Sequence, residues 1–398
     1  MKVLMLARSD IFSLPGGDTI QIENTAKELK KLDVRVDVAT DLKIDIKNYD
    51  LVHIFQLDWI PETYFYVKEA KKYGKPIVLS PIHHAENEVK KFDDIYTFGL
   101  RRLVGLFVKK QEHRDVLKNI YRSFHNRAKI APTLKGAVFG YRRSQKEALL
   151  LSDIVLVQTN CEARDLKNTY GVDFRWEKVV NGVSERFLLV RNFQNTLGFK
   201  DYIICVGRIE ARKNQLNIIE AAKLLRGEKG FEDTRLVFLG RRSEHHKSYV
   251  AKFDLALKEN NWMLHPGFVP QEGIPSYYHF AKVCISASWF ETTGLTSLEA
   301  LFCGTNIVAS GERAKELLGD LAVYCDPCDI NSIASSLKEA YLRPVTPVPE
   351  NFRKEYTWEN AAKQTLEVYN SLFRQGISAN HQSNPVVADN NLLGSSKL

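Results

Sequence analysis

Two carboxylates, Glu291 and Glu299, are separated by seven residues within the stretch 288–304. The apolar run 283–287 before this stretch predicts a short buried strand, and the apolar spacing over 295–302 predicts a helix after it. The N-terminus of that helix would lie between the carboxylates, and it attracts phosphate through its unpaired N–H groups and its dipole. Carboxylates accept hydrogen bonds from sugar hydroxyls. The stretch therefore predicts a site for a ligand with both phosphate and hydroxyl groups.

A purely structural interpretation competes with this one. The sequence Thr296-Ser-Leu-Glu299 fits a capping box, in which Glu299 only satisfies a backbone N–H group. Glu291 fits equally well as a solvated carboxylate in a loop. The spacing alone leaves both interpretations open, and the rest of the chain has to decide between them.

Gly16 and Gly17 lie at a predicted junction between a strand, 3–7, and a helix whose apolar stripe runs over 20–32. Glycines at such a junction let the backbone approach a phosphate closely. A turn without any ligand explains a Gly-Gly pair as well. The Gly-Gly pair therefore supports a phosphate site only in combination with the other motifs.

His83 and His84 follow the predicted strand 76–80, at the end where ligands gather in parallel sheets. Imidazole titrates near neutral pH, so a histidine at this end can position or polarise a reacting group. The alternative is a pair of ordinary loop histidines.

Arg208 and Lys213 follow the predicted strand 201–206 in the second half of the chain. A guanidinium and an ammonium group at this edge can neutralise a diphosphate leaving group. Solvated surface cations are common, so the pair carries more weight than either residue alone.

Alternating strands and helices predict two α/β domains, each with a parallel sheet covered on both faces. The predicted strands are 3–7, 34–39, 50–55, 76–80, 152–157 and 178–183 in the first domain, and 201–206, 235–239, 283–287, 306–309 and 321–324 in the second. A cleft between two such domains is a preferred place for a small-molecule site.

We expect the domains at 1–183 and 184–374, with the first containing a basic helical insert at about 85–150. The last predicted helix begins at Thr357, which is a suitable N-cap residue. The tail 375–398 is rich in Ser, Asn and Gly and is expected to be disordered.

Composition is typical of a soluble globular protein, with 44% hydrophobic and 26% charged residues among 398. No apolar run reaches the roughly 18 to 20 residues of a membrane span, and the N-terminal apolar run is too short for a signal peptide. The six cysteines are therefore expected to be reduced and the chain cytoplasmic. Only Cys325 and Cys328 lie close together, and a structural zinc site takes four ligands, so no metal site is expected.

The segment 101–146 is strongly basic, since its Lys and Arg residues face only Glu112 and Asp115. Apolar residues interleave with these cations at helical intervals. The segment fits an amphipathic surface on anionic lipid, a nucleic-acid groove, or helices that pack on the domain with solvated cations.

These motifs together make the chain similar to the GT-B fold retaining glycosyltransferases of family four (glycosyl transferases group 1), over nearly all of 1–372. The motifs that carry the resemblance are Gly16-Gly17, His83 or His84, Asn181-Gly-Val183, Gly207-Arg208 with Lys213-Asn214, His265-Pro-Gly-Phe-Val269 and the Glu291/Glu299 pair. The resemblance implies an α/β fold with two Rossmann-like parallel-sheet domains facing a cleft. It also implies transfer of a sugar from a nucleotide diphosphate sugar, with retention and without a metal or other cofactor.

The resemblance assigns roles to single residues. Arg208 and Lys213 would bind the donor diphosphate, which Gly16 and Gly17 would face from the first domain. Glu299 would accept the ribose hydroxyls. The remaining donor-binding positions are Val269 and the backbone of Gly294, Leu295 and Thr296.

The catalytic positions implied by the resemblance are Glu291, which would hold hydroxyls of the donor sugar, and a histidine beside the anomeric carbon. His83 is preferred over His84 for the second role. Asn306 departs from the family, which commonly has proline there, and this change is expected to be tolerated.

The basic insert leaves the acceptor side hard to compare with the family. The expected acceptor is a saccharide or lipid-linked chain at the cytoplasmic membrane face, with peripheral contact to anionic lipid, and nucleic acid is not an expected partner. An epimerase or phosphorylase-type relative and a catalytically silent scaffold are the alternatives. The base, the donor sugar and the oligomeric state stay open at this point.

Overall fold

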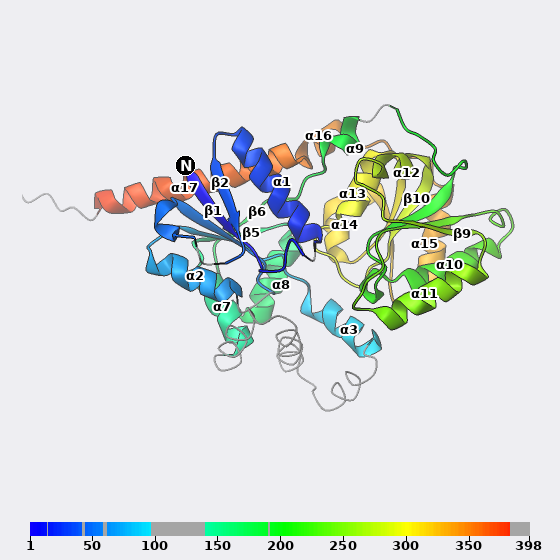
Figure 1. Cartoon of the computed structure of the whole chain (residues 1–398), viewed down its shortest axis with the longest axis horizontal. Coiled ribbons are helices and arrows are strands. Elements are labelled where there is room, and N and C mark those ends of the chain that lie inside the picture. The colour runs from blue at the N-terminus through cyan, green and yellow to red at the C-terminus, as the bar shows by residue number, and fades with distance from the viewer. Residues whose placement is uncertain (14, 42–43, 59–61, 97–139, 190–191, 383–398) are drawn as a thin grey trace, which may run out of the picture.

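Two α/β domains lie side by side along the long axis of the molecule (Figure 1). The computed structural model describes residues 1–382 except 14, 42–43, 59–61, 97–139 and 190–191. Each domain contains a parallel sheet of six strands, as the alternation of strands and helices predicts.

The first sheet has the strand order β2-β1-β3-β4-β5-β6. Its strands are β1 (Lys2–Leu6), β2 (Arg35–Ala39), β3 (Leu51–Phe55), β4 (Ile77–Ser80), β5 (Ile154–Val157) and β6 (Trp176–Lys178). Its helices are α1 (Gly17–Lys31), α2 (Glu62–Lys72), α3 (Glu86–Tyr96), α7 (Tyr141–Leu151) and α8 (Asn160–Tyr170), with a short η1 (Ile46–Asn48). Every residue of β3, β4 and β5 is buried, because helices cover both faces of the sheet.

The second sheet has the strand order β12-β11-β10-β7-β8-β9. Its strands are β7 (Tyr202–Val206), β8 (Leu236–Leu239), β9 (Met263–Gly267), β10 (Ala281–Ser286), β11 (Asn306–Ser310) and β12 (Ala322–Cys325). Its helices are α10 (Gln215–Arg226), α11 (Lys247–Glu259), α12 (Ile274–Phe280), α13 (Leu295–Phe302), α14 (Glu312–Leu318) and α15 (Ile330–Leu342), with short η3 (Ala211–Lys213) and η4 (Gly319–Leu321). Apolar clusters fill both faces of this sheet as well.

The central strands of both sheets are confirmed, and the two errors lie at sheet edges. The predicted strand 178–183 is wrong, because β6 ends at Lys178 and is a three-residue, partly exposed edge strand. The edge strand β9 of the second sheet is missing from the predicted strands. Its Pro266 and Gly267 break the pattern of a strand, and edge positions tolerate both residues.

Asn306, the departure from proline, has a structural role at the start of β11. Its Nδ2 donates to the carbonyls of Ala340 (2.9 Å) and Arg343 (2.8 Å) at the end of α15. A buried amide with both N–H groups satisfied is well tolerated.

The chain crosses between the domains twice, and the two crossings pack on each other. The first crossing leads into α9 (Glu185–Leu189), and the second leads from α16 (Glu350–Glu355) into α17 (Trp358–Gln382). Val183 N–H donates to the carbonyl of Tyr356 (2.8 Å). A Cβ on Gly182 would lie 2.0 Å from the backbone nitrogen of Trp358, so only glycine fits there.

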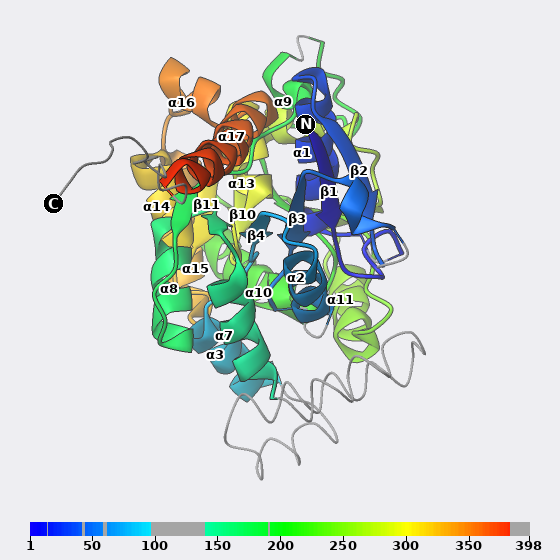
Figure 2. The same cartoon turned by 90° about the vertical axis from the view of Figure 1, so that its left-hand side faces the viewer.

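Helix α17 differs from the predicted domain assignment. Its residues Ala362, Val368 and Tyr369 pack in the same apolar cluster as Ile22 and Leu29 of α1, so the helix covers the first domain (Figure 2). Thr357 caps it as predicted, with its Oγ accepting from Asn360 N–H (3.1 Å). The helix continues to Gln382, so the prediction that the disordered tail begins at 375 is wrong for residues 375–382.

Most of the basic insert, residues 97–139, lies outside the described residues, as does the end of the predicted tail, 383–398. Arg142, Arg143 and Lys146 at the end of the insert lie on α7. Among the helices of the described residues, none is long and apolar enough to cross a membrane.

Candidate active site

The Glu291 loop, residues 287–294, joins β10 to α13 at the carboxyl edge of the second sheet. Helix α13 buries Leu298 and Leu301 in the apolar cluster beside β10. It begins after Gly294, whose φ of 62° lies in the left-handed region that favours glycine. No side chain caps this N-terminus, so its partial positive charge is not offset by a capping carboxylate. The predicted strand, loop and helix are confirmed.

The capping-box interpretation of Glu299 is wrong. Thr296 lies inside α13, one residue beyond its first, and therefore cannot be the N-cap. The Glu299 carboxylate accepts one long hydrogen bond, from the Tyr278 hydroxyl (3.4 Å). Burial raises the pKa of Glu299 to about 8, against the lowering effect of the Tyr278 hydrogen bond. A half-buried carboxyl group with one long hydrogen bond among the described residues retains the capacity to bind ligand hydroxyls.

Glu291 lies among cations and is not a solvated loop carboxylate. Its Oε1 accepts a short hydrogen bond from Lys213 Nζ, and its Oε2 lies 3.4 Å from Arg212 Nη1. Burial would raise the pKa of Glu291, but Lys213 and Arg212 together lower it to about 2. The backbone N–H of Trp289 donates to the Arg212 carbonyl (2.9 Å), which ties the loop to η3. The structure therefore brings the predicted Glu291 and Lys213 into direct contact.

Arg208 spans the interface between the domains. Its Nη2 donates to the carbonyl of Pro15 (2.8 Å), the residue before Gly16. Gly16 is the N-cap of α1, and nothing lies within 4 Å of a Cβ built on Gly17. A guanidinium group from the second domain thus reaches the loop before α1, and the predicted Arg208 and Gly16–Gly17 loop lie together.

The two histidines occupy different environments. His83 is buried, and its Nδ1 lies 2.6 Å from Asp58 Oδ1. Burial would lower the pKa of His83, but the neighbouring Asp58 carboxylate raises it above its ordinary value of 6.5. His84 is partly exposed and packs edge-on against Phe290, with the ring centroids 5.0 Å apart. His84 is thus the histidine that contacts the Glu291 loop, whereas the buried Nε2 of His83 has no hydrogen-bond partner among the described residues. The preference for His83 stays a prediction.

Asp58 holds both histidines. Besides His83 Nδ1, it accepts a hydrogen bond from the backbone N–H of His84 (3.0 Å) through Oδ2. The two charge-assisted contacts fix the turn after β4.

Val269 lies farther along the same edge of the second sheet. It follows β9, which is two strands from β7 in the sheet order. Gly267 at the end of β9 accepts a hydrogen bond from Gly240 N–H (2.9 Å) at the end of β8. The predicted positions Gly207, Arg208 and Val269 thus belong to one row of strand ends.

A buried polar network across the interface was not predicted from the sequence. Asn181 Nδ2 donates to Thr293 Oγ1 (3.1 Å) in the Glu291 loop, and the Thr293 hydroxyl donates a short hydrogen bond to Gln158. Gln158 Nε2 donates to Gln21 Oε1 on α1 (2.8 Å). The network fixes the Glu291 loop relative to the first domain. Asn181 was visible as part of a motif, but nothing in the sequence pairs it with Thr293.

Helix α14 makes a second connection between the domains. Glu316 accepts hydrogen bonds from the backbone N–H groups of Asn160 (2.7 Å) and Cys161 (2.8 Å) at the start of α8. Arg313 Nη2 binds Asp165 Oδ2 (2.8 Å), and its Nη1 donates a short hydrogen bond to the His83 carbonyl. A carboxylate at a helix N-terminus and a buried guanidinium both stabilise the observed arrangement.

Among the described residues, no group of three or more His, Cys, Asp or Glu side chains is arranged to hold a metal ion. The prediction that the chain works without a metal is not tested by that finding.

Comparison with known proteins finds a family model that matches part of the chain. Residues 191–359 match the model of the family described as Glycosyl transferases group 1. O-antigen chain mannosyltransferase B of Escherichia coli is 29% identical over 182 residues, which cover 44% of this chain and 47% of that protein. A D-inositol 3-phosphate glycosyltransferase of Pseudarthrobacter chlorophenolicus is 25% identical over 235 residues, 54% of this chain and 55% of that protein. The chain thus spans about half the length of the curated relatives it matches.

Solved structures resemble nearly the whole chain. A sucrose-phosphate synthase from Thermosynechococcus elongatus superposes with a TM-score of 0.68 at 14% identity, covering 94% of this chain and 100% of that one. The Anabaena protein HepE in complex with UDP superposes with a TM-score of 0.65 at 14% identity, covering 93% and 100%. These likenesses show the fold, which is the GT-B arrangement of two Rossmann-like domains.

Proposed function

We propose that this chain is a glycosyltransferase of group 1 that transfers a sugar from a nucleoside diphosphate sugar to an acceptor hydroxyl, a proposal supported by the family match and the GT-B fold. The observation that carries this proposal is the charge arrangement at the interface. Lys213 and Arg212 surround Glu291, the uncapped N-terminus of α13 follows three residues later, and Arg208 reaches the Gly16 loop. Cations and a helix N-terminus suit a diphosphate, while Glu291 and Glu299 suit hydroxyls.

In the proposed reaction, charge builds up on the departing nucleoside diphosphate as the glycosidic bond breaks. Lys213 and Arg208 stabilise that charge, and the backbone N–H groups at the start of α13 bind the phosphate oxygens. Lys213 already pairs with Glu291, so its ammonium group is held in place before the donor arrives. Preorganised cations stabilise the leaving group without having to reorient during the reaction.

The two glutamates bind the two sugars of the donor. Glu299 accepts hydrogen bonds from the ribose hydroxyls, and the long hydrogen bond from Tyr278, its one partner within the described part of the chain, leaves lone pairs for them. Glu291 stays ionised at neutral pH and accepts from hydroxyls of the transferred sugar. His84, held by Asp58, lies on the first-domain side of the same loop and positions the reacting end of that sugar.

Retention of configuration, independence from metals and other cofactors, and a saccharide or lipid-linked acceptor complete the proposal. The acceptor class draws support from the O-antigen chain mannosyltransferase among the relatives. A cytoplasmic location with peripheral contact to anionic lipid draws support from the basic composition of 101–146.

A donor screen tests the proposal. Purified protein is incubated with a panel of UDP, GDP and ADP hexoses, with and without saccharide or lipid-linked acceptors, and released nucleoside diphosphate is measured. We expect release from one donor, stimulated by an acceptor, and its loss in Lys213→Met. Donor turnover without any sugar transfer would instead indicate an epimerase-type or hydrolytic relative.

A further inference from the structure

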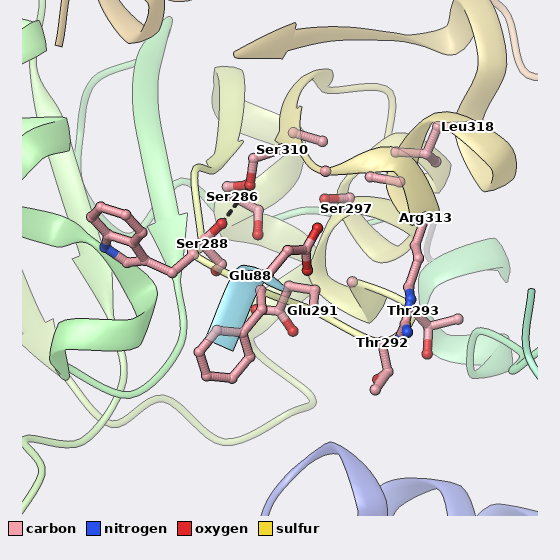
Figure 3. Close-up of a pocket in the computed structure, with 16 residues that line it drawn as sticks. Glu88, Ser286, Ser288, Glu291, Thr292, Thr293, Ser297, Ser310, Arg313 and Leu318 are labelled. Carbon is pink, nitrogen blue, oxygen red and sulfur yellow. Dashed lines mark hydrogen bonds between the residues drawn. The ribbon is translucent and has the colours of Figure 1, made fainter. Parts of the chain in front are cut away.

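A small cavity between helix α3 and the Glu291 loop has no role in the assignments made so far (Figure 3). The second domain lines it with Glu291, Gly294, Ser310 and Arg313, among others, and the first domain contributes Glu88 from α3. Its volume is about 20 Å³, which is enough for one water-sized group. The cavity adjoins both Glu291 and the start of α13, so it borders the proposed places of the donor sugar and phosphate.

Helix α3 is fixed against the Glu291 loop by aromatic contacts. Phe92 lies with its ring centroid 5.6 Å from that of Phe290 and 6.1 Å from that of Trp289. Edge-to-face and tilted pairs at these separations are favourable. The helix therefore presents Glu88, one turn before Phe92, at a defined place beside the loop.

The Glu88 carboxylate is enclosed by the second domain but is not satisfied by it. A Cβ built on Gly311 would lie 3.3 Å from Glu88 Oε1, so the carboxylate rests against this glycine. Within the ranges that the structure describes, no side chain or backbone group donates a hydrogen bond to it. Burial raises the pKa of Glu88, and the positive charge of Arg313 opposes that rise, which places the two groups within electrostatic reach.

Arg313 supplies the complementary group. Its side chain is 95% buried, and its Nη1 and Nη2 are bound to His83 and Asp165. Its Nε is also buried, yet it has no hydrogen-bond partner among the described residues. An unpaired buried N–H group is costly, so a partner is expected.

Glu88 and Arg313 both line the cavity, and a hydroxyl group has the chemistry that each of them needs, because it donates one hydrogen bond and accepts others. It would donate to Glu88 and accept from Arg313 Nε–H. A phosphate oxygen fits less well, because it cannot donate and Glu88 and Glu291 would repel its charge.

We propose that this cavity receives one hydroxyl group of the sugar being transferred, and that Glu88 thereby helps to determine which sugar the protein accepts. The inference rests on the proposed function. Since Glu88 comes from the first domain, the hydroxyl is recognised only when α3 and the Glu291 loop are together. Sugars that lack the hydroxyl, or carry it on the other face of the ring, leave Glu88 and Arg313 unpaired and are disfavoured.

The test compares Glu88→Gln and Glu88→Ala with a matched control, Glu86→Gln. Glu86 lies on the same helix but pairs with Arg142 (3.4 Å) outside the cavity. Release of nucleoside diphosphate is measured for each sugar donor, and binding of UDP, GDP and ADP is measured by calorimetry. We expect Glu88→Ala to lower kcat/KM for the preferred donor at least about tenfold, with nucleoside diphosphate affinity within twofold of wild type and Glu86→Gln unchanged.

Donor analogues with single deoxy positions identify the contact. For one position only, wild type and Glu88→Ala should use the deoxy donor with similar kcat/KM, because the hydrogen bond is already absent. If Glu88→Ala lowers kcat/KM equally for every deoxy donor, the cavity holds only water and the inference is overturned. So would a Glu88→Ala protein with wild-type kcat/KM. If wild type binds no nucleoside diphosphate and releases none, the proposed function itself fails and the inference fails with it.

Discussion

Replacing Glu299 by glutamine should stabilise the folded protein at alkaline pH and leave its stability nearly unchanged at pH 4.5. Burial raises the folded-state pKa of this carboxyl group from 4.5 to about 8, so the folded state holds a proton that the unfolded state has lost over that interval. Wild type and Glu299→Gln should therefore be about equally stable below pH 4.5. As pH rises from 4.5 to 8, wild type becomes progressively less stable than the variant. Above pH 8 the difference stays constant.

The size of the effect follows from the shift. One pKa unit corresponds to about 1.4 kcal/mol, so the full shift is worth on the order of 5 kcal/mol, and roughly 2 to 5 kcal/mol once partial solvent access is allowed for. For a domain of this size we expect Glu299→Gln to melt roughly 5 to 15 °C above wild type at pH 8.5.

Thermal unfolding between pH 4.5 and 9, without nucleotide, measures this difference. Glu312→Gln is the control, because Glu312 is an exposed carboxylate paired with Lys315 on α14. A difference between Glu299→Gln and wild type that does not change with pH would refute the buried-carboxyl account of Glu299. Ribose hydroxyls should favour the ionised form, so nucleoside diphosphate binding at pH 7 should also release up to one proton, which calorimetry in buffers of different ionisation enthalpy detects.

Three further substitutions test the site and the interface. Lys213→Met should abolish donor turnover, because it removes the cation closest to Glu291. A calorimetric titration of this variant should find the affinity for nucleoside diphosphate reduced at least about tenfold. An affinity equal to that of wild type would contradict the role of Lys213 in binding phosphate. Gly182→Ala should destabilise the protein by roughly 3 kcal/mol or more in urea unfolding, because its Cβ would collide with the backbone of Trp358; an unchanged midpoint would mean that the crossing adjusts freely. Glu316→Ala should loosen the contact between α14 and α8. Small-angle scattering should then report a larger radius of gyration than for wild type. Identical scattering profiles would show that this contact does not hold the two domains together.

The central strands and the strand-loop-helix around Glu291 could be predicted because they depend on local pattern. The strands β3, β4 and β5 are buried on both faces, so their apolar runs are unbroken. The edge strands β6 and β9 lack that signal, because β6 is only three residues long and partly exposed and β9 contains Pro266 and Gly267. The domain on which α17 packs could not be predicted either. Its amphipathic pattern is clear, but the domain that it covers depends on the return of the chain across the interface.

Within the site, residue types could be predicted but pairings could not. The sequence places Glu291 and Lys213 far apart, and only the contact between η3 and the Glu291 loop joins them. His83 and His84 are adjacent, so no spacing distinguishes them, whereas burial and the Phe290 contact do. The Thr293–Gln158–Gln21 network and Arg313 are products of two domains meeting, and each partner alone is an ordinary polar residue.

The donor site at the interface is tested most directly by calorimetric titration of the wild-type protein with UDP, GDP and ADP. We predict that one of the three binds with 1:1 stoichiometry and that Arg208→Ala, Lys213→Met and Glu299→Gln each weaken it. If none of the three nucleotides binds, the GT-B fold serves here as a scaffold without a donor, and the proposed transfer is contradicted.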